Sequence, residues 1–167
     1  MRPTDRLGRL RAGLLCAALA ACLALPAAAI AATPGGGTAQ VTIANDVHLT
    51  AKVVAVVDVS FTCDPFLIMD WTSGTLVEST VGHLADGGVT LTQASGKSIA
   101  VSSASFDNAT VVCDGATPQT QSIVVMARDL PWKSGTAVAS ARVQVYSDGF
   151  QFRDIGDSGP VVVKLGK

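Results

Sequence analysis

Apolar and polar residues alternate along residues 47–63, in the run VHLTAKVVAVVDVSFTC, except at Val54 and Val56, where apolar residues take polar positions. Apolar side chains occupy the odd positions from Val47 to Cys63, and polar ones such as His48 and Asp58 lie between them. A two-residue period is that of a β-strand, whose successive side chains point to opposite faces. One strand of this length would extend for about 56 Å, whereas a compact domain of about 140 residues has a radius of gyration of only about 14 Å. We therefore expect the run to bend or to change sheets at residues 52–55.

Shorter runs rich in Val, Thr, Ser and Ile follow the same pattern and predict further strands. They are residues 39–44, 88–93, 98–105, 109–113, 121–127, 137–146 and 160–165. Turn residues separate most of them, as in SGK at 95–97, DG at 148–149 and DGATP at 114–118. About seven to nine short strands without a long helix predict an all-β, immunoglobulin-like sandwich of two sheets.

Residues 65–86 interrupt this pattern with the apolar run Phe66 to Met69, followed by Trp71. The sequence TLVE at 75–78 matches a capping box, which predicts the start of a helix. Two interpretations of the segment remain open at this point. It forms either an extra pair of strands or a lid.

The first 31 residues predict a cleaved signal peptide. Four arginines precede an apolar stretch at residues 12–25, which is shorter than the roughly 20 residues that span a bilayer. Small residues place the cleavage site after Ala31, with Ala29 as the alternative. Residues 32–37 then form a Pro/Gly linker, and residues 38–167 form one domain. The run LAAC ending at Cys22 also resembles a bacterial lipoprotein signal, which would attach the protein to a membrane through a lipid.

Charge narrows the class of partner. The chain has a net charge of −1, and removal of residues 1–31 leaves eight basic and twelve acidic residues, a net charge of −4. An acidic balance argues against nucleic acid and anionic lipid as partners. With 49% apolar residues, the chain is also too apolar for a disordered tail.

Cys63 and Cys113 are the two cysteines that remain after signal cleavage. In an exported protein such a pair predicts one disulfide. Closing a loop of this length stabilises the fold by about 4 kcal/mol in the chain-entropy model. The alternative, a metal site, would need a C-x-x-C pair or a nearby His, and the sequence has neither at these positions.

Three segments carry a resemblance to a known family: VSFTCDP at 59–65, VVCDG at 111–115 with the strand that follows it, and WKSGTAVASA at 132–141. They resemble small secreted immunoglobulin-like β-sandwich proteins common in actinobacteria, a family without an established function. The resemblance covers most of residues 38–165 and implies the sandwich fold, with no catalytic residues to carry over. Many relatives have a second Cys pair in the last third, and residues 143–153 of this chain contain none.

Two groups of residues invite a catalytic interpretation. The sequence GDSGP around Ser158 resembles the nucleophile loop of trypsin-like proteases, but the second Gly before Pro and the Ala-Ala-His-Cys setting of the catalytic His are missing. His83, with Asp86 nearby and Asp70 upstream, offers a base and an orienting carboxylate without an activated nucleophile. We favour a turn for Ser158 and an exposed loop for His83, and we expect no enzymatic activity and no cofactor.

Metal binding is a weaker hypothesis. Asp64 and Asp114 each follow a cysteine of the predicted disulfide, which would bring the two carboxylates to one end of the sandwich. With Asp70 or Asp86 they would offer oxygen ligands to Ca²⁺. Because Asp is also favoured in turns, where it bonds its own backbone, we expect turns rather than a metal site.

Phe66, Met69, Trp71 and Trp132 provide large apolar side chains in a chain with only 5% aromatic residues. One interpretation places a Trp in the core, against the disulfide. The other makes the four residues a contact surface for a partner.

These observations predict a secreted, non-enzymatic binding or interaction module whose partner is an extracellular protein, glycan or small molecule. The alternatives are an extracellular carrier with a ligand cleft under residues 65–86, and a lipid-anchored surface protein attached through Cys22. A hydrolase or a protease inhibitor is a third hypothesis, in which the loops near Cys63 or Cys113 would act as the inhibitory loop.

Overall fold

A computed structural model describes residues 39–148 and 153–166. All of them belong to one compact unit. The predicted signal peptide with Cys22 and the predicted linker lie outside the described residues.

Twelve strands contain most of the described residues, and no α-helix occurs in residues 39–148 or 153–166. In chain order they are β1 (Gln40–Ile43), β2 (Asp46–Thr50), β3 (Val54–Thr62), β4 (Phe66–Asp70), β5 (Thr75–Ser79), β6 (Val81–Ser95), β7 (Ser98–Ser105), β8 (Ala109–Val112), β9 (Gln119–Met126), β10 (Gly135–Ser147), β11 (Arg153–Asp157) and β12 (Val161–Gly166). The prediction of an all-β protein is confirmed.

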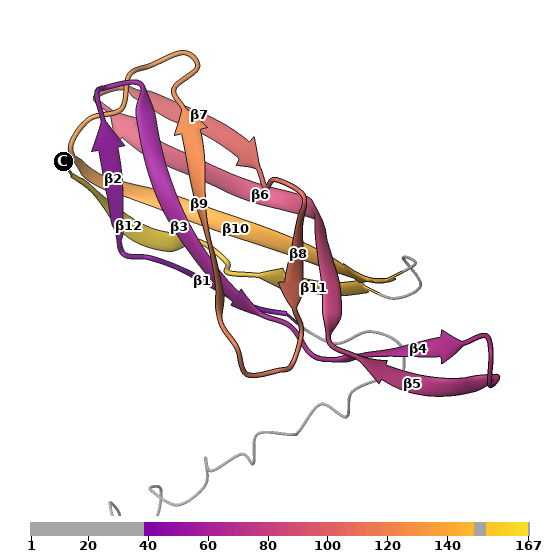
Figure 1. Cartoon of the computed structure of the whole chain (residues 1–167). Coiled ribbons are helices and arrows are strands. Elements are labelled where there is room, and N and C mark those ends of the chain that lie inside the picture. The colour runs from indigo at the N-terminus through magenta and orange to yellow at the C-terminus, as the bar shows by residue number, and fades with distance from the viewer. Residues whose placement is uncertain (1–38, 149–152, 167) are drawn as a thin grey trace, which may run out of the picture. The chain divides into compact units, whose positions relative to one another are not determined.

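Ten strands form one sheet in the order β1-β3-β2-β12-β10-β6-β7, with β9 beside β3, β8 beside β6 and β11 beside β10. The sheet folds over on itself as a sandwich (Figure 1). One layer consists of β1, β2, β3 and β9, and the other is built around β6 and β10. The parallel pairing of β12 with β2 joins the layers, and contacts of β1 with β10 and of β7 with β9 close them around one core. A separate two-stranded sheet contains only β4 and β5.

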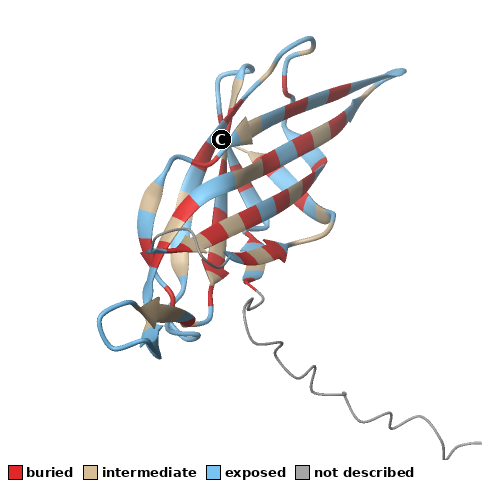
Figure 2. Ribbon diagram, turned by 90° about the vertical axis from the view of Figure 1, so that its right-hand side faces the viewer, coloured by how far each residue is buried: buried red, intermediate tan, exposed pale blue. Residues whose placement is uncertain are grey.

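Buried and exposed residues alternate along the long strands, as the red and pale blue bands of Figure 2 show, and the buried ones fill the core. In β3 the side chains of Ala55, Val57, Val59 and Phe61 are buried, while Asp58 between them is exposed. The same period continues along β10, where each odd position from Ala137 to Val145 is buried. A two-residue period therefore places one face of each long strand inward.

The long run at 47–63 does not bend smoothly but reverses completely. Residues 51–53 form a turn, and β2 and β3 pair as an antiparallel hairpin with Leu49 opposite Ala55. Ala51 takes up the reversal with a φ of 56°, a left-handed conformation that is unusual for a residue with a side chain. The run is therefore interrupted near the predicted residues 52–55, but by a hairpin turn within one sheet and not by the expected bend or change of sheet.

Two local predictions need correction. The TLVE sequence at 75–78 lies in strand β5, where Leu76 pairs with Met69, so no helix starts there. Its capping-box pattern is outweighed by cross-strand pairing with the apolar run of β4. Strand β11 was not predicted because Arg153 and Asp154 begin it, and Asp154 is buried.

The disulfide is confirmed between Cys63, which follows β3, and Cys113, which follows β8. A disulfide indicates an oxidising location outside the cytoplasm. Across residues 39–148 and 153–166, no helix is long and apolar enough to cross a membrane.

Candidate functional site

The hairpin of β4 and β5 lies at the end of the sandwich where β3 finishes and β6 begins, and it extends away from the ten-stranded sheet (Figure 1). We call residues 66–79 the hairpin. Of the two interpretations of this segment, the structure shows the extra pair of strands, in the register Ile68 to Val77 and Met69 to Leu76.

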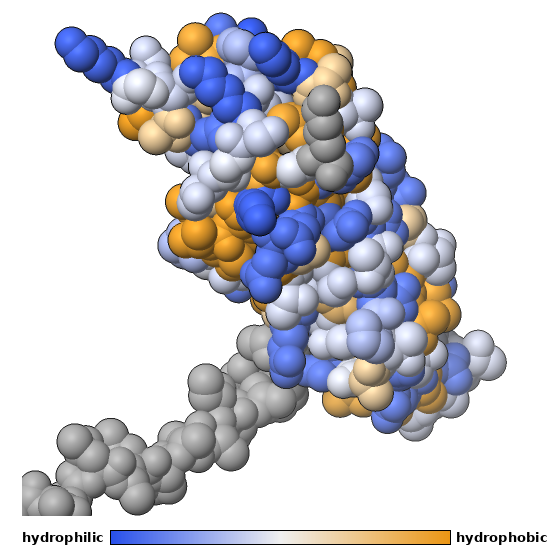
Figure 3. Space-filling view, turned by 90° about the vertical axis from the view of Figure 1, so that its left-hand side faces the viewer, coloured by the Kyte–Doolittle hydropathy of each residue, from blue (hydrophilic) through white to orange (hydrophobic). Residues whose placement is uncertain are grey.

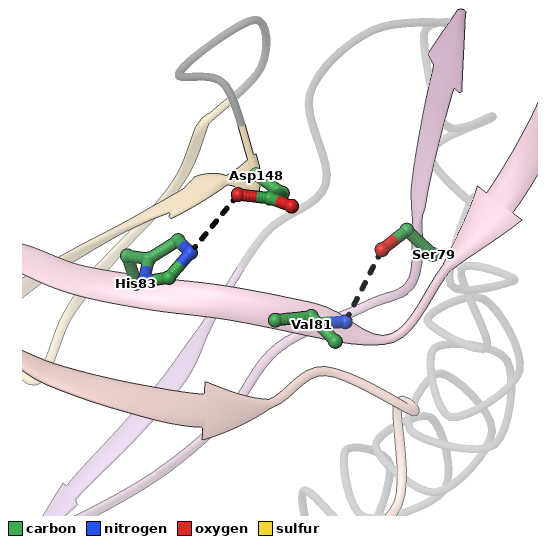
Figure 4. Close-up of polar contacts among 4 residues, drawn as sticks. All are labelled: Ser79, Val81, His83 and Asp148. Atoms are coloured by element: carbon green, nitrogen blue, oxygen red, sulfur yellow. Dashed lines mark hydrogen bonds and ion pairs between the residues drawn. The ribbon is translucent and has the colours of Figure 1, made fainter. Parts of the chain in front are cut away.

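The base of the hairpin is fixed to the sandwich. Phe66 is buried, and a methyl group at Gly82 would lie 2.7 Å from Cys113 Sγ and 3.3 Å from Cε2 of the Phe66 ring, so the ring packs beside the disulfide. The Cys113 N–H donates to the carbonyl of Thr80 at 2.8 Å. The Val81 N–H donates to the hydroxyl of Ser79 at 3.3 Å (Figure 4). These contacts hold the start and the end of the hairpin.

The tip of the hairpin is ordered by Asp70. One oxygen of its carboxylate accepts the Thr72 N–H at 2.9 Å, and the other accepts the Ser73 hydroxyl at 2.7 Å. These hydrogen bonds, with the Ser73 hydroxyl contributing most, lower the pKa of Asp70 below its ordinary value. Gly74 closes the turn with a φ of 69° and donates its N–H to the Asp70 carbonyl at 2.7 Å. Asp70 therefore stabilises the turn that contains Trp71.

Beyond Phe66 the hairpin exposes apolar side chains. Trp71 at the tip is 82% exposed, Leu76 58% and Leu67 46%, and no residue of β5 is buried. Figure 2 shows this pale blue and tan hairpin next to the banded strands of the sandwich. A two-stranded ribbon is marginally stable in water, and large exposed apolar groups mark interaction sites. The hairpin is the strongest candidate for a binding surface in the described residues.

The four predicted surface residues do not form one surface. Trp132 is completely buried and Phe66 nearly so, Met69 is half-buried, and only Trp71 is fully exposed. The prediction is therefore wrong for Phe66 and Trp132, which are core residues. Trp132 donates its indole N–H to the carbonyl of Val125, which lies opposite Ala55 at the far end of β3 from Cys63. The aromatic ring on the disulfide is thus Phe66 and not a tryptophan.

Asp64 and Asp114 do lie at one end of the sandwich. A methyl group at Gly115 would lie 3.3 Å from Asp64 Oδ1, and the Gly115 N–H donates to the Cys63 carbonyl. Asp114 accepts the N–H groups of Ala116 and Thr117 and the Thr117 hydroxyl. These bonds, led by the Thr117 hydroxyl, lower its pKa to about 2. The observed hydrogen bonds of Asp114 order its own turn. Within the described ranges no three metal-ligating side chains group together.

His83 and Ser158, the two candidate catalytic side chains, are far apart. His83 lies in β6 rather than in a loop, and its Nε2 is 3.4 Å from Oδ1 of Asp148 (Figure 4). The Ser158 hydroxyl accepts the Ala141 N–H and donates to the Gly159 carbonyl. Because His83 pairs with Tyr146 and Ser158 bonds Ala141, five residues away on β10, the two side chains are separated by about 16 Å along that strand.

At the opposite end of the sandwich, a hollow of about 420 Å³ is lined by Leu49, Ala51, Lys52, Trp132, Lys133 and Ser134. We call this the Trp132 hollow. Leu49 and Trp132 are buried beneath it, and Lys52 and Lys133 are exposed beside it. Sequence reasoning missed both lysines, because they are distant in the chain and only the backbone bond from Trp132 N–H to the Lys52 carbonyl, at 2.7 Å, brings them together. The hollow also lies away from residues 65–86, under which a ligand cleft was predicted.

Charge is divided between the two ends. The connections β2–β3, β6–β7 and β9–β10 meet at the Trp132 end and carry Lys52, Lys97, Arg128 and Lys133 against one acid, Asp129. Deep blue hydrophilic side chains and smaller orange patches share this upper end in Figure 3. Residues 63–80 and 113–118, at the hairpin end, contain four acids and no Lys or Arg.

Comparison with known proteins identified no relative of this chain. No family model, no curated protein and no solved structure matches the chain.

Proposed function

We propose that this chain is an exported, non-enzymatic interaction module that binds a protein through the hairpin β4–β5. The observation that carries the proposal is the 82% exposure of Trp71 at the tip of a ribbon whose base is fixed by a buried Phe66 and a disulfide. A rigid base limits the entropy lost on binding, and Trp is among the residues that contribute most to protein interfaces.

The composition of the hairpin supports a protein rather than a lipid surface as the partner. Its only charged residues are Asp70 and Glu78, and anionic membranes attract basic segments instead. Apolar side chains lie on both faces of the ribbon, in the pairs Ile68–Val77 and Met69–Leu76. A partner with an apolar recess and a basic margin would complement this surface.

The strand arrangement supports an immunoglobulin-like identity. Strands β1, β3 and β9 form one layer, β12, β10, β6 and β7 follow one another in the second, and β2 runs parallel to β12. As in immunoglobulin domains, the disulfide links the two layers, since Cys63 follows β3 of one layer and Cys113 follows β8, which pairs with β6 of the other. Export is supported by the signal-like residues 1–31 and by this disulfide.

Photo-crosslinking tests the proposal. A benzophenone amino acid replaces Leu76 on the hairpin or, as a control, Val162 on β12, which is 67% exposed. In the culture of a secreting host we expect a discrete crosslinked product from position 76 and none from position 162, and Trp71→Ala to lower the yield at position 76 about tenfold or more. Equal products at both positions, or an unchanged yield without Trp71, would contradict the proposal.

A further inference from the structure

The hairpin and the Trp132 hollow are complementary in polarity and charge, although they belong to opposite ends of the same molecule. At its tip the hairpin exposes Trp71 beside the carboxylate of Asp70, and Glu78 lies nearer its base, opposite Leu67. The hollow has buried apolar residues beneath it and two lysines beside it. Strand β3 runs from one end to the other over nine residues, about 30 Å, so one copy cannot join its own hairpin to its own hollow.

The backbone around the hollow is held in place. Gln93, which is only 3% exposed, accepts the Lys133 N–H at 2.9 Å and donates its side-chain amide to the Lys133 carbonyl at 2.7 Å. Trp132 is fixed by its indole bond to Val125 and its backbone bond to Lys52. The hollow therefore exists before any partner arrives, which favours binding.

The volume of the hollow suits an aromatic anchor. The hollow of about 420 Å³ lies within the range of sites that bind small groups, and it opens to solvent, so an indole ring can lie against its exposed lining above the buried Trp132. Lys52 and Lys133 beside it would face the carboxylate of Asp70, which directly precedes Trp71 in the chain. Opposite charges across an interface speed encounter and fix its orientation.

From this complementarity we infer that the partner of the hairpin is a second copy of this chain, which receives Trp71 at its Trp132 hollow with Lys52 and Lys133 facing Asp70. The inference rests on the proposed function and names its partner. Each such contact leaves one hairpin and one hollow unused, so the contact is heterologous and the copies add head to tail. A contact made by one hairpin is small, which predicts weak association.

Sedimentation equilibrium on the purified, disulfide-bonded protein tests the inference. We expect the average mass to rise above that of a monomer between about 10 μM and 1 mM, and to fall again at about 0.5 M salt, which screens the ion pairs. Trp71→Ala, without a hairpin anchor, and Lys133→Glu, with a reversed charge at the hollow, are each expected to stay monomeric. Lys164→Glu makes the same charge change on the exposed surface of β12, and it should associate like the unaltered protein.

Mixing the two monomeric variants is the decisive step. Trp71→Ala keeps an intact hollow and Lys133→Glu keeps an intact hairpin, so a head-to-tail contact predicts a 1:1 dimer that grows no further. A mixture that stays monomeric while the unaltered protein associates would overturn the inference, because the contact would then be symmetric. An unaltered protein that stays monomeric at about 1 mM would overturn it as well. In that case a crosslink from position 76 to a different protein would leave the proposed function standing, whereas the absence of any crosslink would remove both.

Discussion

The two tryptophans of this chain occupy opposite ends of the sandwich and opposite environments. Trp132 is completely buried and its indole N–H is bonded to a backbone carbonyl, whereas Trp71 is 82% exposed at the tip of the hairpin. Trp132 fills space in the core, whereas Trp71 contributes little to packing. The comparison shows that in a chain poor in aromatic residues one large side chain stabilises the fold while the other is retained at the surface.

Replacing the buried tryptophan should have the largest effect on stability. Trp132→Ala removes a completely buried side chain, leaves a cavity in its place and deprives the Val125 carbonyl of its indole donor, so we expect the free energy of unfolding to fall by about 3–5 kcal/mol. Urea unfolding followed by circular dichroism measures this. A loss below about 1 kcal/mol would show that Trp132 is not a core residue.

Breaking the disulfide should destabilise the end of the sandwich that carries the hairpin. Cys63→Ser removes the link to Cys113, fifty residues away, and we expect a loss of about 2–5 kcal/mol in the free energy of unfolding. Hydrogen exchange should also speed up at the base of the hairpin, since Cys113 anchors it through the Thr80 carbonyl. Unchanged stability under reducing conditions would contradict this expectation.

Crowding the base of the hairpin should have a smaller effect. In Gly82→Ala the new methyl group would lie 2.7 Å from both Cys113 Sγ and Val145 Cγ1, so the disulfide and its neighbours must shift. We expect a loss of about 1–3 kcal/mol by thermal unfolding. Gly166→Ala is the matched control because nothing lies within 4 Å of the added carbon there. Equal melting temperatures for the two variants would show that the base is loosely packed.

Asp114 gives the hairpin end a pH dependence. Its pKa of about 2 in the folded protein is below the ordinary value of 3.8, so the unfolded chain binds more protons between these values. The stability from this carboxylate is therefore complete above pH 3.8 and is lost as the pH falls towards 2. Carbon-13 NMR titration should give the low pKa, and Thr117→Val should raise it by removing the hydroxyl that contributes most. A midpoint of 3.8 before the substitution would contradict the observed hydrogen bonds.

Sequence reasoning recovered the fold where the two-residue period and the turn residues were unambiguous. The buried positions of β3, the β6–β7 turn at Gly96 and the disulfide all follow from local patterns. Strand β11 escaped prediction because a buried Asp154 contradicts simple alternation.

The site was harder to predict because it depends on contacts between distant segments. Nothing near Trp132 in the sequence indicates that its backbone bonds Lys52, or that Gln93 fixes Lys133. The TLVE sequence predicted a helix from local signals, although pairing with residues 66–70 makes it a strand. Of four large apolar residues, the sequence could not separate the exposed Trp71 from the buried Phe66 and Trp132.

The unfolding free energy of Trp71→Ala tests the central claim most directly. If Trp71 serves recognition and not folding, urea unfolding should change by no more than about 0.5 kcal/mol, the ordinary range for an exposed position, in contrast to Trp132→Ala. The circular dichroism spectrum of the folded protein should stay the same. A loss of about 2 kcal/mol or more would show that Trp71 stabilises the fold, and it would contradict the assignment of the hairpin as a binding surface.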